Sequence, residues 1–314
     1  MNRKRRKLVA DFGGTHLRIG FSYEKKIENL SKVRYDKKRS PLELILDYIS
    51  ENSFSFDQVR VCAAGPVEDG KIEITNNGLK ISKQEIIDAL KINDVAIFND
   101  AEAACYYLPE IENKSYLRIN SAEPKNSTFA YIALGTGLGI SCVKKHMGKS
   151  IVVSGEGGYS HLPYPKRNKL LIEAINIIRN DFPRISCERL ISGPGIELIY
   201  NALTKINNQN KKLTSEEIVN LALNDKNGYE YMSCSFLFEL LGELSASIAL
   251  IYGARGGVFL GGGLLERLYP IMPKDLLIKN FLIPGRMKDY VNSIPLNIIK
   301  DDLVSLKGCS SFEK

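Results

Sequence analysis

A glycine turn between two apolar stretches, at Leu8–Phe21, constrains the fold of this chain more than any other feature. The stretch has the sequence LVADFGGTHLRIGF, in which an apolar run precedes Asp11 and an alternating apolar pattern follows Thr15. Strand, tight glycine turn and second strand explain this pattern. A P-loop or a dinucleotide-binding loop would require a helix after the glycines, so neither fits.

This turn has the composition of a site for a polyphosphate and its magnesium ion. The groups that would converge there are the amides of Gly13 and Gly14, the hydroxyl of Thr15 and the carboxylate of Asp11. Backbone N–H groups bind phosphate oxygens, and a carboxylate binds Mg²⁺ or its waters. An ordinary hairpin with a Gly-Gly turn explains the same residues equally well.

A second copy of the pattern occurs at Phe129–Val143, with the sequence FAYIALGTGLGISCV. Its turn contains Gly135, Thr136 and Gly137 between two apolar stretches. The two copies lie roughly 120 residues apart, which indicates an internal duplication. Two such hairpins would hold one phosphate chain from both sides.

Strand patterns alternate with helix patterns through the first third of the chain. Apolar residues at helical spacing predict helices at Pro41–Ser50 and Ser82–Leu90, each with a serine at its N-terminus as a cap. Short apolar runs predict strands at Val59–Ala64 and Val95–Phe98. This alternation predicts an α/β fold.

Asn99 and Asp100 follow the predicted strand Val95–Phe98 and precede a predicted helix that begins at Ala101. Ligands of open α/β sheets bind beyond the carboxyl ends of the strands, where a carboxylate is well placed as a general base. Asn and Asp are also common helix N-caps, which is the second interpretation of the pair.

Three further segments carry candidate site residues. Glu156 lies among glycines in Gly155–His161, where it would face a ligand or would be a solvated side chain of a surface turn. Glu188 lies in a predicted loop before a helix start at Pro194. The glycines at 261–263 would admit a flat ligand or would allow close packing of a strand on a helix.

The composition excludes several classes of function. Much of the net charge of +7 comes from Arg3–Lys7, Lys37–Arg39 and scattered lysines, and no basic helix with interleaved aromatic residues suggests nucleic-acid binding. No apolar run approaches the roughly 18 residues that span a bilayer, so no membrane partner and a cytoplasmic location are expected. The six cysteines are isolated, which supports neither a zinc site nor a disulfide framework.

Five blocks in order resemble the bacterial ATP-dependent glucokinase family, over nearly the whole chain. They are DFGGTHLR, TNN-GLKIS with FNDAEA, ALGTGLG, GEGGY with CERLISGPG, and GGVFLGGG followed by GRMKDYVNSIP. The resemblance implies the two-domain actin-like ATPase fold, a duplicated ribonuclease H-like fold with a cleft between its domains. We expect a small domain at 1–107, completed by 296–314, and a large domain at 108–295.

The resemblance also implies a role for each candidate residue. Asn99, Asp100, Glu156, Tyr159 and Glu188 would bind the sugar, with Asp100 as the general base. Asp11 would position Mg²⁺ through water. Gly13, Gly14, Thr15, Gly135, Thr136 and Gly137 would hold the phosphates, and Gly261, Gly262 and Gly263 would border the adenine base.

The family likeness implies transfer of the γ-phosphoryl group of ATP to the 6-hydroxyl of glucose, by a homodimer. Two positions depart from the family pattern: His16 stands where Asn is usual, and Tyr159 stands where the sugar-binding loop has His. His161 lies two residues further on. A kinase for another hexose or an amino sugar therefore stays open, as does a catalytically silent sugar or nucleotide sensor, although a silent sensor would most naturally lack Asp100.

Overall fold

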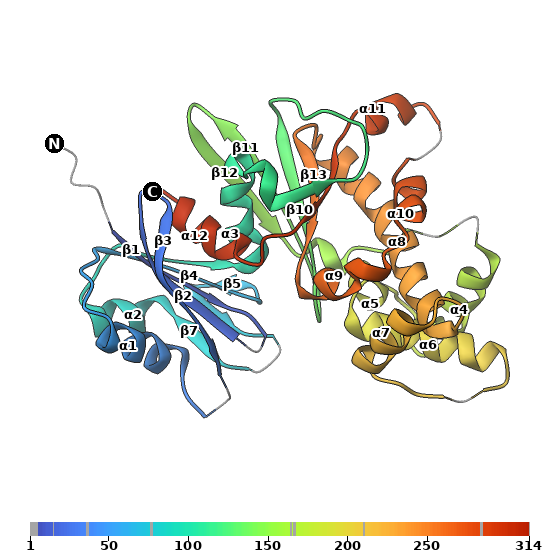
Figure 1. Cartoon of the computed structure of the whole chain (residues 1–314), viewed down its shortest axis with the longest axis horizontal. Helices are drawn as coiled ribbons and strands as arrows, with labels where there is room; N and C mark the ends of the chain where they lie inside the picture. Colours follow the sequence, from blue (N-terminus) through green and yellow to red (C-terminus); the bar gives the residue numbers. More distant parts are fainter. Residues whose placement is uncertain are drawn as a thin grey trace. The chain divides into compact units, whose positions relative to one another are not determined.

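The computed structural model describes residues 6–14, 16–35, 38–75, 78–163, 165, 168–209, 211–282 and 285–313 (Figure 1). They form two compact units. The first contains Met1–Ile111, Val143–Ser154 and Asp301–Lys314, and the second contains Glu112–Cys142 and Gly155–Lys300. The predicted α/β class is confirmed, because helices accompany a sheet in each unit.

The main sheet of the first unit has the strand order β3-β2-β1-β4-β8. Its strands are β1 (Lys7–Phe12), β2 (His16–Tyr23), β3 (Lys26–Arg34), β4 (Gln58–Ala63) and β8 (Val95–Asn99). β1 pairs with β2 in antiparallel fashion and with β4 in parallel fashion, and β4 is parallel to β8. Every residue of β1 and β4 is buried, as expected for central strands with parallel neighbours.

Helices α1 (Pro41–Glu51) and α2 (Lys83–Leu90) begin at the predicted serine caps. Ser40 forms a full capping box with Glu43, and the Ser82 side chain accepts the amide hydrogen of Glu85. A small sheet precedes α2 and contains β5 (Val67–Glu68), β6 (Lys71–Glu73) and β7 (Lys80–Ser82).

The C-terminal helix α12 (Val304–Ser311) packs on α3 (Asp100–Tyr107) and on β1 in the first unit. The contact between the two helices is so close that a Cβ at Gly308 would lie 1.7 Å from the backbone oxygen of Ala103. The buried Lys7 ammonium donates hydrogen bonds to the backbone oxygens of Ser310 (2.7 Å), in the last turn of α12, and of Phe312 (2.8 Å), just after it. The end of the described chain is thereby fixed to its first strand.

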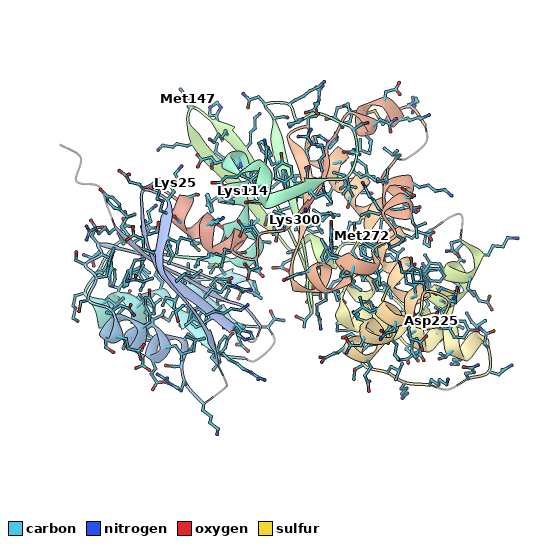
Figure 2. All side chains as sticks on the ribbon, in the orientation of Figure 1. Lys25, Lys114, Met147, Asp225, Met272 and Lys300 are labelled. Carbon is cyan, nitrogen blue, oxygen red and sulfur yellow. The ribbon has the colours of Figure 1, made fainter. Side chains whose placement is uncertain are left out.

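The segment Val143–Ser154 lies with the first unit, although the predicted boundaries place it in the second. Ion pairs of Glu110 contribute to this attachment, because its carboxylate bridges Lys25 and Lys145, with 3.2 Å to the latter. Figure 2 labels Lys25 and also Met147, the 90% exposed residue at the tip of the attached hairpin. The salt bridges join two distant hairpins and could not be read from local sequence.

The six-stranded sheet has the strand order β12-β11-β10-β13-β14-β9, and its residues outside Val143–Ser154 belong to the second unit. Its strands are β9 (Tyr116–Arg118), β10 (Thr128–Leu134), β11 (Leu138–His146), β12 (Lys149–Gly155), β13 (Gly257–Gly261) and β14 (Leu296–Ile299). The predicted boundary at residue 296 assigns β14 to the first domain. β14 lies in the second unit instead, because it pairs with β13 and β9.

Helices of the second unit surround one long central helix, α8 (Tyr229–Ile251), which contacts α6, α7 and α10 (Figure 1). The other helices of this unit are α4 (Lys169–Arg179), α5 (Cys187–Leu190), α6 (Gly193–Ile206), α7 (Ser215–Asn224), α9 (Gly263–Leu268), α10 (Lys274–Phe281) and α11 (Lys288–Asn292). 3₁₀ turns lie at Asn113–Ser115, Gly157–Tyr159 and Tyr269–Ile271 in the second unit, and at Leu108–Glu110 in the first. In the described part of the chain, α8 alone has the length and hydropathy of a membrane span. The sequence was expected to contain no apolar run of that length, so this helix is a departure from that expectation. Since 78% of its apolar window is buried, its composition is that of a core helix.

Candidate active site

The predicted first hairpin is confirmed, with β1 and β2 joined by a tight turn. The amide of Gly13 donates to the backbone oxygen of His16 (3.0 Å), and the Tyr35 hydroxyl donates to the backbone oxygen of Gly13. Thr15, which was predicted to bind phosphate, lies outside the described residues. The Gly14 backbone is exposed at the tip of the turn.

Asp11 is a buried carboxylate at the end of β1, with 6% of its surface exposed. One oxygen lies 3.5 Å from Nη1 of Arg18, and the other accepts a weak hydrogen bond from the Cys62 thiol at 3.6 Å. Burial raises the pKa of Asp11 to about 6, although the Arg18 guanidinium opposes the rise and the charge of Asp100 adds to it. Asp11 and Asp100 are therefore close enough to influence each other.

Arg18 and Asp302 belong to this cluster, and sequence reasoning did not identify either residue. Nη2 of Arg18 lies 3.5 Å from the Asp302 carboxylate, and the Lys32 ammonium lies 3.9 Å from the same group. Arg18 thus lies between two carboxylates. It could have been noticed in the DFGGTHLR block, but Asp302 lies far away in the sequence and gives no local signal.

Asn99 caps α3, as the second interpretation of the Asn99-Asp100 pair proposed. Its side-chain oxygen accepts the amide hydrogens of Ala101 (2.9 Å) and Glu102 (3.3 Å), and its Nδ2 donates to the backbone oxygen of Gly65 (3.1 Å). The cap uses Oδ1, and the bond to Gly65 uses one of the two N–H groups of Nδ2. The second N–H group can therefore donate to a ligand. The capping role and a ligand-binding role are compatible.

Asp100 is the first residue of α3 and is partly exposed. Its Oδ1 accepts the amide hydrogen of Ala101 at 2.8 Å, and its backbone oxygen accepts the hydroxyl hydrogen of Ser305 at 3.0 Å. Burial raises the pKa of the carboxyl group, while the Ala101 amide lowers it to a smaller extent. A carboxylate with a raised pKa is a stronger base, which suits proton abstraction from a hydroxyl group.

The second glycine turn, at the end of β10, is held from two sides. The Gly135 amide donates to the backbone oxygen of Gly137 (2.9 Å), and the Gly193 amide at the start of α6 donates to the backbone oxygen of Gly135 (3.0 Å). Thr136 is exposed at the tip of this turn. β10 and β11 are neighbours in the sheet, which confirms the predicted second hairpin.

Glu188 lies in the single helical turn α5, capped by Ser186, and not in the loop that the sequence predicted. Its Oε2 accepts the amide hydrogen of Leu138 at 2.9 Å. This contact connects α5 to the residue that directly follows the second glycine turn. A Cβ at Gly137 would lie 2.8 Å from the same oxygen, so the contact needs a glycine there.

The loop Gly155–His161 is fixed to the segment that precedes Glu188. His161 forms an isolated β-bridge with Ser186, and the Cys187 amide donates to the backbone oxygen of Ser160 at 2.9 Å. Nη2 of Arg184 donates to the backbone oxygen of Tyr159, also at 2.9 Å. These contacts bring Tyr159 and Glu188, from separate parts of the sequence, to one place.

Tyr159 and Glu188 line a cavity of about 260 Å³ in the second unit. The lining residues are Thr136, Tyr159, Arg184, Ser186, Glu188, Arg189, Ser192 and Pro194. The Glu188 carboxylate, with burial and Glu156, raises the pKa of the half-exposed Tyr159 hydroxyl. The cavity thus joins the second glycine turn to a carboxylate and a phenol, which both form hydrogen bonds with hydroxyl groups.

The glycines between β13 and α9 support the packing interpretation at two positions. A Cβ at Gly262 would lie 2.2 Å from the backbone oxygen of Leu134, and φ is +98° there, which favours glycine. A Cβ at Gly261 would lie 2.6 Å from the Tyr131 hydroxyl. Around the Cβ position of Gly263 no atom of the described structure lies within 4 Å, so its backbone is accessible.

Among the described residues, no group of three or more His, Cys, Asp and Glu side chains could hold a metal ion by itself. Mg²⁺ in nucleotide sites keeps several waters and uses one or two carboxylates together with the phosphates. The Asp11 carboxylate, whose Oδ2 lies 3.5 Å from the Arg18 guanidinium, is one such carboxylate. A single carboxylate is enough for a magnesium ion that takes its other ligands from water and phosphate.

Comparison with known proteins identifies relatives over the full length. A family model described as glucokinase matches residues 8–314. A glucokinase of Colwellia psychrerythraea is 30% identical over 97% of this chain and 95% of its own length. The crystal structure of a glucokinase from an Antarctic psychrotroph has a TM-score of 0.85, at 28% identity and 98% coverage of both chains.

A glucokinase of Balamuthia mandrillaris, solved in complex with glucose, has a TM-score of 0.80 at 18% identity, and covers 98% of this chain and 93% of its own. At that identity the likeness concerns the fold alone. Together these structures confirm the predicted two-domain actin-like fold.

Proposed function

Because the chain belongs to the glucokinase family, we propose that it transfers the γ-phosphoryl group of ATP to the 6-hydroxyl of glucose and so forms glucose 6-phosphate. The observation that best supports this activity is Asp100, a carboxylate of raised pKa at the N-terminus of α3, next to the strand end at Asn99. Phosphoryl transfer depends mainly on positioning and on charge stabilisation, so one general base and well-held substrates suffice.

In the first unit, Asp100 accepts the proton of the sugar hydroxyl, and the second N–H of Asn99 Nδ2 holds a neighbouring hydroxyl. Oδ1 of Asn99 already accepts two amide hydrogens of α3. The contact of Asn99 with the sugar is therefore a hydrogen bond that Asn99 donates. The amides of Gly13 and Gly14 and the hydroxyl of Thr15 bind phosphate oxygens.

Asp11 holds Mg²⁺ through water in this proposal. The ion, when bound with ATP, neutralises charge on the phosphates during transfer. Arg18 keeps the Asp11 side chain in place from one side, and the Cys62 thiol keeps it from the other.

In the second unit, Glu156, Tyr159 and Glu188 bind sugar hydroxyls, and Tyr159 substitutes for the histidine of the family. The turn Gly135, Thr136 and Gly137 contacts the phosphates from its side. Gly261, Gly262 and Gly263 border the adenine base, where the exposed backbone of Gly263 leaves room for a flat ring.

The proposal includes a homodimer that works in the cytoplasm. Glucose is the preferred sugar, by family likeness. Another hexose or an amino sugar is the second candidate, because Tyr159 has a longer reach than a histidine.

A coupled assay of ADP release over glucose, mannose, fructose and glucosamine tests the activity. We expect the highest kcat/KM with glucose. A preference for another sugar would replace the substrate but keep the reaction, whereas binding of sugar without ADP release would indicate a silent sensor.

Replacement of Asp100 by Asn tests the assignment of the base. Asp100→Asn keeps the shape of the side chain but cannot accept the proton, so turnover should fall by about a hundredfold or more. Glucose affinity, measured by calorimetry, should largely survive. Near-normal turnover of the folded variant would remove Asp100 from this role.

A further inference from the structure

We infer that Glu188 couples sugar binding to nucleotide binding, because its single carboxylate serves both sides of the cavity in the second unit. The inference rests on the proposed function, in which a sugar hydroxyl binds to Glu188 and ATP phosphates bind to the turn Gly135–Gly137. It adds to that function one side chain that contacts the sugar and also holds the turn that binds the phosphates of ATP.

At least three hydrogen bonds of the described residues hold the turn and the residue that follows it. Two of them join backbone groups, from Gly135 to Gly137 and from Gly193 to Gly135. The third runs from the Leu138 amide to Oε2 of Glu188 at 2.9 Å. Of the three, this one depends on a side chain that also lines the cavity with Tyr159 and Thr136.

The carboxylate has enough acceptor positions for both tasks. An ionised carboxylate accepts about four hydrogen bonds, and the Leu138 amide uses one of them. A sugar hydroxyl that donates to the same group would restrict the rotation of the Glu188 side chain. The side chain would then hold the Leu138 amide, and with it the turn, in one position.

Gly137 leaves the space that this contact requires. A Cβ there would lie 2.8 Å from Oε2 and 3.5 Å from Cδ of Glu188. Its backbone lies outside the left-handed region, so space and not conformation accounts for the glycine. A methyl group at 137 would push the Glu188 carboxylate away from the Leu138 amide, while Glu156 and Tyr159, the other proposed sugar contacts of this unit, stay unchanged.

A shared carboxylate predicts positive coupling. The first ligand orders the Glu188 side chain, so the second ligand loses less conformational freedom when it binds. The effect must be reciprocal: a nucleotide that tightens glucose binding is itself bound more tightly with glucose present, by the same factor.

Calorimetry on the full-length protein tests the coupling. The dissociation constant of glucose is measured with and without saturating AMP-PNP and Mg²⁺, and the ratio of the two values is the coupling factor. For the wild type we expect a factor of at least about five. Gly137→Ala should lower it toward one. Leu223→Ala is the control, because Leu223 is an exposed residue of α7 outside both proposed binding sites, and it should keep the wild-type factor.

Glu188→Asp provides a second variant if Gly137→Ala does not fold. Aspartate is shorter by one methylene group, so its carboxylate cannot reach the Leu138 amide and the sugar together, and the factor should again fall toward one. Equal factors in Gly137→Ala and Leu223→Ala, or in Glu188→Asp and the wild type, would overturn the inference. Failure of the wild type to bind glucose at all would instead remove the proposed function, and this inference with it.

Discussion

Asp11 combines a proposed functional role with an unfavourable environment. Burial raises its pKa from 3.8 to about 6, so the ionised form is penalised in the folded protein. With Asp11 protonated, the folded state avoids the cost of a buried charge. This contribution to the free energy of unfolding is fully present below the pKa of Asp11 in the unfolded chain, and it is lost as the pH rises through about 6, the pKa in the folded state. At neutral pH, the protein therefore retains a charge that destabilises its fold.

We expect Asp11→Asn to show this penalty. One pH unit of raised pKa is worth about 1.4 kcal/mol, so the stability of Asp11→Asn relative to wild type should increase by on the order of 2–3 kcal/mol between pH 4 and pH 7. Urea unfolding at both pH values, with EDTA present, measures the difference. Magnesium-dependent turnover should be lost. A stability difference that does not change with pH would show that the Asp11 charge is well compensated by Arg18.

Tyr159 and His161 compete for the place of the family histidine in the sugar-binding loop. Tyr159 lines the cavity with Glu188, whereas the His161 backbone pairs with Ser186. Tyr159→Phe should therefore raise the KM for glucose. The loss of one neutral hydrogen bond should weaken the binding free energy of glucose by about 0.5–1.5 kcal/mol. His161→Ala should change the KM little. The opposite result in steady-state kinetics would assign the contact to His161.

At the scale of elements, the position of α3 depends on α12. Gly308 has its Cα against the backbone of Ala103, where an added Cβ would lie 1.7 Å from an oxygen atom. Gly308→Ala must separate the two helices, and overpacking of this kind typically destabilises by about 1–3 kcal/mol. Because α3 begins with Asp100, turnover should fall as well.

Gly155→Ala is the control for this variant, since nothing lies within 4 Å of its Cβ position. Its effect on the unfolding free energy should stay within about 0.5 kcal/mol. Thermal and chemical unfolding of both variants, with kcat measured on each, would decide the matter. Equal stability of the two variants would mean that α12 can shift without loss.

Sequence patterns predicted the elements that local forces determine. The two glycine hairpins, the serine caps of α1 and α2 and the strand before Asn99 all follow from periodicity and capping, which act over a few residues. The contacts of Lys7 with Ser310, of Arg18 with Asp302 and of Glu188 with Leu138 join residues far apart in sequence. No local pattern encodes such contacts, so they had to come from the structure.

At the scale of the whole molecule, the first unit is assembled from three separate segments of the chain. Its sheet begins at residue 7, whereas α12, which packs on β1 and α3, occupies Val304–Ser311. Val9 and Cys62 share one apolar cluster with Leu306 and Cys309. The core of the first unit is therefore incomplete without the last segment.

On the ribosome, this arrangement reverses the usual order in which domains mature. Domains at the beginning of a chain generally fold first during synthesis, but here the unit that contains Asp100 must wait for α12. In arrested nascent chains with residues 1–300 exposed, we expect proteases to cut within 1–111 and to spare 155–300. Equal protection of both regions would contradict this order. The proposed general base would thus become usable only after α12 has been synthesised and has left the ribosome, although the sheet beside it is made first.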